Sequence, residues 1–129
     1  MSKLIREVLH AFPLGVGRIK IDDRKMNERE DKMATFIMLI NYTEEGIKGI
    51  KDAPNRKAAA EKLVGDLGGE VKSDYLTMGS YDRVLVVDFP DGESVAKFAL
   101  SVGSRGFIRT NTLRAFGDDE EKAIIDGAL

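Results

Sequence analysis

A short polar turn leads directly into an apolar strand in the stretch MGSYDRVLVVDFPD, residues 78–91. The turn brings together a glycine, a phenol and a carboxylate: Gly79, Tyr81 and Asp82. At the rim of a cleft, the phenol and the carboxylate can hydrogen-bond a small molecule, and Asp82 becomes a general base if burial raises its pKa. An ordinary turn explains the same residues, because Gly79 supplies a positive φ and Asp82 accepts backbone N–H bonds. The sequence leaves both interpretations open.

Polar side chains also interrupt two of the apolar segments. Tyr42 ends the segment ATFIMLINY, and RTNT (residues 109–112) is a strongly polar part of the segment FIRTNTLRAF. Alternation along a strand sends Arg109 to one face and Thr112 to the other. These residues form either an exposed edge strand protected by its polarity or the polar floor of a small-molecule pocket. The predicted ligand-binding residues are Tyr42, Gly79, Tyr81, Asp82, Arg109 and Thr112, and Lys48 and Arg56 are interpreted as solvated helix charges.

The residue inventory excludes several kinds of chemistry. The 129 residues include no cysteine and a single histidine, His10. Disulfides, thiolate metal sites and a cysteine nucleophile are therefore excluded, and no Ser-His-Asp set can form after residue 33. We expect no metal and no cofactor.

Charge and hydropathy narrow the partners and the compartment. The net charge is −2 and no basic cluster is present, which disfavours a nucleic-acid groove. No apolar run is long enough to cross a bilayer, and the N-terminus lacks the features of a secretory signal. We expect a cytoplasmic protein that binds neither nucleic acid nor membrane.

Hydrophobic spacing predicts an alternation of strands and helices after Met33. Apolar, β-favouring segments predict strands at residues 34–42, 70–78, 81–89 and 107–116. In the second strand, Val71 and Ser73 are predicted to share one face.

Capping and breaking residues set the predicted helices. The first helix is capped by Thr43, broken or re-aimed at Pro54, and stopped at residues 68–69, where one glycine takes a positive φ. A second helix starts at Ser94, and a short terminal helix starts at Asp118 in a capping-box pattern.

The order β-α-β-β-α-β predicts an α+β, ferredoxin-like fold with a four-stranded antiparallel sheet and both helices on one face. Residues 34–40 and 84–87 are apolar on both faces of their strands. One chain has no third layer for the second face, so we expect a homodimer that packs through that sheet face.

The first 33 residues differ from the rest of the chain. They carry eight Lys/Arg and six Asp/Glu, whereas the remaining 96 residues carry twelve and sixteen. Residues 4–12 show an apolar helical stripe, and residues 22–32 are nearly all charged. We predict an N-terminal extension at 1–33, helical or poorly ordered and dispensable, a translated leader ahead of a start at Met33. The alternative is a helix that docks on the domain of residues 34–129.

Three stretches resemble the GYD domain family: INYTEEGIKGIKDAPNR (40–56), YLTMGSYDRVLVV (75–87) and RTNTLRAF (109–116). The resemblance covers nearly all of residues 34–129, and the motif residues fall on Gly79, Tyr81 and Asp82. It implies a ferredoxin-like domain of the dimeric α/β-barrel type and assigns no activity.

Two functions remain open on the sequence. The first is a homodimeric small-molecule-binding or interaction protein, which needs only the apolar sheet face and a modest pocket. The alternative is a cofactor-free enzyme, isomerase-like or monooxygenase-like, in which Asp82, Tyr81 or Arg109 supplies the acid-base group.

Overall fold

The computed structural model of the protein describes residues 33–129. The predicted helix at residues 4–12, the charged segment at 22–32 and the leader interpretation lie outside these residues. The described elements are β1 (Ala34–Tyr42), α3 (Glu44–Lys48), the 3-10 turn η1 (Ile50–Asp52), α4 (Ala53–Asp66), β2 (Glu70–Leu76), β3 (Arg83–Phe89), α5 (Gly92–Ser104), β4 (Ile108–Ala115) and α6 (Asp118–Ala128).

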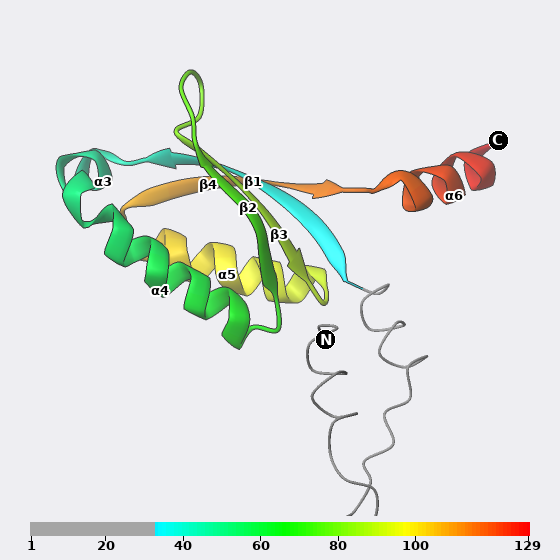
Figure 1. The fold of residues 1–129 in the computed structure, drawn as a ribbon, viewed down its shortest axis with the longest axis horizontal. Helices are drawn as coiled ribbons and strands as arrows, with labels where there is room; N and C mark the ends of the chain where they lie inside the picture. The colour runs from blue at the N-terminus through cyan, green and yellow to red at the C-terminus, as the bar shows by residue number, and fades with distance from the viewer. Residues whose placement is uncertain (1–32) are drawn as a thin grey trace, which may run out of the picture. The chain divides into compact units, whose positions relative to one another are not determined.

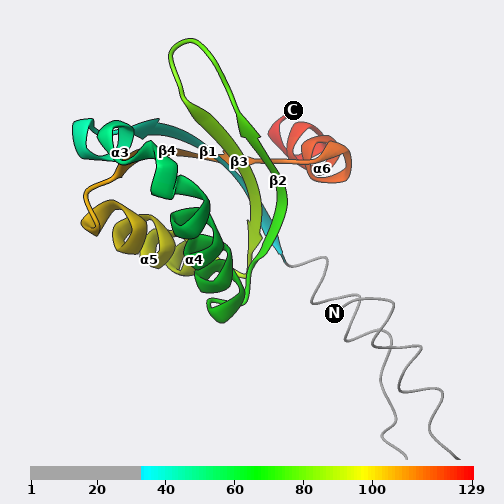
Figure 2. The ribbon, with the colours of Figure 1, turned by 60° about the vertical axis from the view of Figure 1, so that its left-hand side comes forward.

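The strands form a four-stranded antiparallel sheet in the order β2-β3-β1-β4. The long helices α4 and α5 lie side by side on one face of this sheet (Figures 1 and 2). The predicted α+β, ferredoxin-like fold is therefore confirmed. We call the face under α4 and α5 the covered face, and the other face the open face.

The register of β1 assigns its side chains to the two faces. Met38 pairs with Leu85 on the covered face, whereas Ile37 pairs with Val86 on the open face. All hydrophobic side chains of the core are at most 7% exposed: Phe36, Met38, Ile40, Leu85, Val87 and Phe89 from the sheet, Val64 from α4, and Val95, Phe98 and Val102 from α5. The core thus lies entirely between the covered face and the two helices.

The second strand contains a bulge that the strand pattern did not predict. Val71 pairs with Val87 but Ser73 pairs with Val86, so one β2 residue is skipped. The bulge turns Val71 to the covered face and Ser73 to the open face. Their predicted common face is wrong, because an extra residue shifts the alternation of every side chain beyond it. The strand also ends at Leu76, before the predicted residue 78.

The helix around Pro54 changes direction for a reason other than the predicted one. Pro54 lies in the first turn of α4, and the residue before it, Ala53, keeps α-helical angles (φ −54°, ψ −39°). The break lies earlier, at Gly49, after α3 has ended. Proline is tolerated in a first turn because its missing N–H has no helical acceptor there.

The remaining helix ends give a mixed result. Thr43 caps α3 as predicted, accepting a 3.1 Å bond from the Gly46 N–H. Gly68 has the predicted positive φ, +81°. Helix α5 begins before Ser94, because the Asp91 carboxylate accepts the Ser94 N–H at 2.7 Å, a bond that also holds the pKa of Asp91 below its usual range. The terminal helix α6 starts at the predicted residue, but its N-cap is Gly117 and no side chain caps it.

No helix in residues 33–129 has both the length and the apolar composition of a membrane span.

Candidate functional site

The turn between β2 and β3 is closed by its own hydrogen bonds. The Thr77 N–H donates to the Asp82 carbonyl at 2.9 Å, and the Thr77 hydroxyl donates to the Tyr81 carbonyl at 2.8 Å. Gly79 has a φ of +104°, and a Cβ there would meet no atom within 4 Å. The turn therefore requires glycine for its backbone angle and not for space.

Asp82 ties this turn to the end of β1. Its N–H donates to the Ile40 carbonyl at 2.9 Å, and its carboxylate accepts the backbone N–H of Tyr42 at 2.9 Å. The Asp82 carboxylate thus supplies an acceptor for β1 just beyond the point where its pairing with β3 begins. Asp82 therefore accepts a backbone N–H, but from the end of β1 and not from within its own turn.

Tyr81 and Arg109 belong to the open face. The Asn111 side-chain amide donates to the Tyr81 hydroxyl at 3.4 Å, so the tyrosine spans from the β3 side of β1 to β4. Asn111 pairs with Leu39, and Arg109 pairs with Asn41 two residues along the same face.

Tyr42 and Thr112 belong to the covered side instead. Thr112 pairs with Met38 in the core register, and Tyr42 lines a pocket beneath α4. The sheet therefore separates Tyr81 and Arg109 from Tyr42 and Thr112, while the other two predicted ligand-binding residues, Gly79 and Asp82, lie in the turn before β3. Ligand binding by this set stays a prediction, as does the enzyme alternative built on Asp82, Tyr81 and Arg109.

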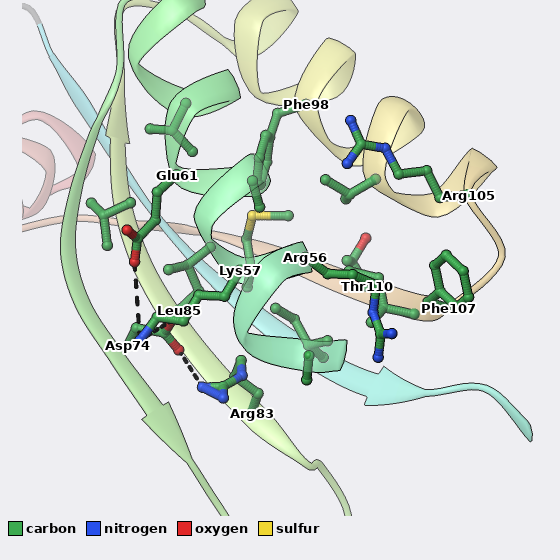
Figure 3. A pocket seen from close by; sticks show the side chains of 18 of the residues that line it. Arg56, Lys57, Glu61, Asp74, Arg83, Leu85, Phe98, Arg105, Phe107 and Thr110 are labelled. Carbon is green, nitrogen blue, oxygen red and sulfur yellow. Dashed lines mark hydrogen bonds and ion pairs between the residues drawn. The ribbon is translucent and has the colours of Figure 1, made fainter. Parts of the chain in front are cut away.

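The pocket lies between α4, α5 and the covered face and has a volume of about 100 Å³. Its floor is apolar and includes Met38, Val64 and Phe98, which are at most 2% exposed. Polar and charged side chains surround this floor (Figure 3). They are Tyr42, Arg56, Lys57, Glu61, Asp74, Arg83, Arg105 and Thr110.

An ion cluster forms one side of the pocket. Arg83 Nη1 lies 2.9 Å from Asp74 Oδ1, and Lys57 Nζ lies 3.4 Å from Asp74 Oδ2. The Asp74 side chain is only 9% exposed, so both cations neutralise a carboxylate that is largely removed from water. Burial lowers the pKa of Arg83, but the Tyr42 side chain and the Asp74 charge outweigh it and hold that pKa above its usual value.

The sequence interpretation missed this cluster. Asp74 and Arg83 stand on either side of the turn at Gly79, so a hairpin register centred on that turn would have placed them near each other. Lys57 comes from α4, and no local spacing connects it to the hairpin.

Arg56 is a structural cation and not the predicted solvated one. Its side chain is 17% exposed, and its guanidinium lies 4.5 Å from the centroid of the Phe107 ring. It donates to the carbonyls of Gly49 at 3.1 Å and Gly46 at 3.3 Å. Arg56 therefore satisfies the last carbonyls of α3 and joins it to α4. Lys48 is solvated as predicted, with 73% of its side chain exposed.

The open face is apolar at its centre. One rung across the sheet contains Ser73, Val86, Ile37 and Leu113, and the next contains Tyr75, Val84, Leu39 and Asn111. Leu113 is 45% exposed, and the four apolar side chains of β1 and β3 in these rungs are half-buried. Polar rungs border this centre, with Asn41 beside Arg109 at one end and Thr35 hydrogen-bonded to Asp88 (2.6 Å) at the other.

Helix α6 follows β4 and contains no buried residue. Arg114 holds its base, since Nη2 lies 2.8 Å from a Glu120 oxygen and the guanidinium lies 4.3 Å from the centroid of the Phe116 ring. Beyond that base, Ile124 and Ile125 are 48% and 49% exposed. The helix thus has a fixed starting point and an apolar side that no residue from 33 to 129 covers.

No group of three or more His, Cys, Asp and Glu side chains within residues 33–129 is arranged to hold a metal ion.

Comparisons with known proteins identify relatives of this domain. Residues 36–125 match the GYD domain. A protein of Thermus thermophilus named "Glutamine synthetase and cystathionine beta-lyase binding protein" is 38% identical over 84 residues, 64% of this chain and 88% of the relative.

Solved structures include a second match from Thermus thermophilus, the protein TTHA0845, with 28% identity and a TM-score of 0.44 over 66% of this chain and 95% of that one. The feast or famine regulatory protein of Mycobacterium tuberculosis, complexed with L-methionine, has 16% identity and a TM-score of 0.52 over 89% of this chain and 69% of that one. The likeness to the regulatory protein concerns the fold alone.

Proposed function

Because the chain belongs to the GYD domain family, we propose that it is a homodimeric protein-interaction module that binds glutamine synthetase and cystathionine beta-lyase of its own cell. The partner enzymes come from the name of the Thermus relative. The observation that carries the proposal is the open sheet face, where an apolar centre is bordered by polar rungs.

This face has the composition of an interface that a second copy covers. An apolar centre within a polar rim is the usual anatomy of a protein–protein contact. Arg109 lies near one end of the face, and Asp88 and Glu70 lie near the other. Lys72 of the same chain lies 3.9 Å from each of these two carboxylates, so the charged groups form the polar rim of the proposed contact.

A different surface is available for the enzymes. Helix α6 presents Ile124 and Ile125 to solvent, and its first turn is acidic from Asp118 to Glu121. An amphipathic helix with an uncovered apolar side typically binds in a groove of its partner. The proposal therefore assigns the open face to the second copy and α6 to the enzyme.

Biolayer interferometry with the purified full chain and the two enzymes from the same organism tests this assignment. We expect both enzymes to bind the wild-type chain. The double substitution Ile124→Asp, Ile125→Asp should abolish binding, because it places charges in an apolar contact, while light scattering still shows a dimer.

The matched control is Lys122→Ala, on the same helix, where the side chain is 79% exposed and pairs with Asp126. Enzyme binding by this variant should equal that of the wild type. If neither enzyme binds the wild-type chain, the enzyme partners are wrong. If the double variant binds normally, α6 is not the binding surface.

A further inference from the structure

The pocket beneath α4 is large enough to hold part of a small molecule. An apolar cavity of about 150 Å³ in another protein holds benzene. A volume of about 100 Å³ therefore accommodates an aliphatic chain of about four carbons.

The wall of this pocket is shaped by small residues. Ala53 and Ala60 line it from α4, opposite the larger Met38 and Phe98. Val64 is the one buried residue of α4, whereas α5 contributes several. The small side chains of α4 consequently leave space above the sheet, and the floor of that space is apolar.

Most of the cations around the pocket already have partners. Lys57 and Arg83 share the Asp74 carboxylate, and Arg56 binds the carbonyls at the end of α3. Arg105 differs: among residues 33–129 its side chain makes no ion pair or hydrogen bond. A cation after the end of α5 is stabilised by the negative end of the helix dipole. That interaction alone does not explain why the Arg105 side chain lines the pocket.

Arg105 and a hydroxyl group define one end of the pocket. Figure 3 shows the Arg105 guanidinium directed toward the pocket from the end of α5, with Thr110 on the β4 side of the same space. Within the described part of the chain, the Thr110 side chain has no hydrogen-bond partner. A guanidinium and a hydroxyl together provide the donors that a carboxylate accepts.

We propose that this pocket binds a short-chain aliphatic carboxylate, with its hydrocarbon chain on Met38, Val64 and Phe98 and its carboxylate at Arg105 and Thr110. The carboxylate is the matching charge because Arg105 is the unpaired cation of the described lining. The site does not depend on the proposed dimer or on the enzyme partners.

Isothermal titration calorimetry of the full chain tests the proposal with pentanoate, pentan-1-ol and pentylamine as probes. We expect pentanoate to bind, and the alcohol and the amine to bind about tenfold more weakly or not at all, because the alcohol is neutral and the amine is cationic, so neither offers a negative charge to pair with Arg105. Arg105→Gln should weaken pentanoate binding about tenfold or more and leave the affinity for the alcohol unchanged.

Two further variants separate the head-group contact from the apolar pocket. Ala60→Leu fills the space from α4 and should abolish pentanoate binding while the melting temperature stays equal or rises. Lys97→Gln is the matched control, since Lys97 lies on α5, pairs with Glu93 and does not line the pocket. Normal pentanoate binding is expected there.

Three results overturn the proposal. They are no binding of pentanoate at millimolar concentration, equal affinity for all three probes, and unchanged pentanoate affinity in Arg105→Gln.

Discussion

Val86 and Val87 are neighbours in β3 with identical side chains and opposite surroundings. Val87 is 0% exposed beneath the helices, whereas Val86 is half-buried on the open face, between Ser73 and Ile37. The same contrast applies to Met38 and Leu39 in β1. Both faces of these strands therefore carry similarly hydrophobic side chains, but only those on the covered face are fully buried.

The difference follows from the path of the chain. The connections β1-α4-β2 and β3-α5-β4 each join strands that run parallel across an intervening neighbour. Such crossovers are right-handed in nearly all proteins, and because β1 and β3 are antiparallel, both helices fall on the same face. Both helices thereby cover one face of the sheet, and the other face is available to a partner.

Aspartate substitutions in β3 should give the largest effect. Val87→Asp places a charge in the core and should lower the free energy of unfolding by about 4 kcal/mol or more. Val86→Asp should leave the protomer folded and dissociate the proposed dimer. Urea unfolding and light scattering measure the two outcomes.

The two substitutions Val86→Asp and Val87→Asp test whether the two faces of the sheet have different roles. If Val86→Asp unfolds the chain as Val87→Asp does, the open face belongs to the protomer's own core. If the wild type is a folded monomer at micromolar concentration, no second copy covers the open face.

A smaller effect is expected where the turn joins β1. Asp82→Ala removes the acceptor of the Tyr42 N–H and should lower the free energy of unfolding by about 1–3 kcal/mol. Asp82→Asn keeps a carbonyl oxygen there and should lose less. Thermal unfolding measures both, with the exposed turn residue Ser80→Ala as a control that should change little. Equal stability of Asp82→Ala and the wild type would show that this bond contributes nothing.

The smallest effect is expected from removing residues 1–32. A chain that begins at Met33 should keep its dimer and its stability within about 0.5 kcal/mol, because we assign the open face to a second copy. Calorimetry and light scattering check both properties. Aggregation, or melting many degrees lower, would instead show that the first residues are part of the fold.

The amino-acid sequence by itself determined the order of the strands and helices, the cap at Thr43, a positive φ at Gly79 and at one of Gly68 and Gly69, and the presence of two apolar sheet faces. These features depend on interactions within a few residues, or on an alternation that continues along a strand. They were accordingly predictable from neighbouring residues.

Only the tertiary structure decided which side chains meet. The bulge in β2 reversed the face of Val71, Arg56 became a part-buried structural cation, and Lys57 joined the hairpin ion pair of Asp74 and Arg83. Each outcome depends on the register and separation of segments distant in the chain, which local spacing does not encode. For the same reason the sheet placed some of the predicted ligand-binding residues on opposite faces, although most of them lie near one end of it.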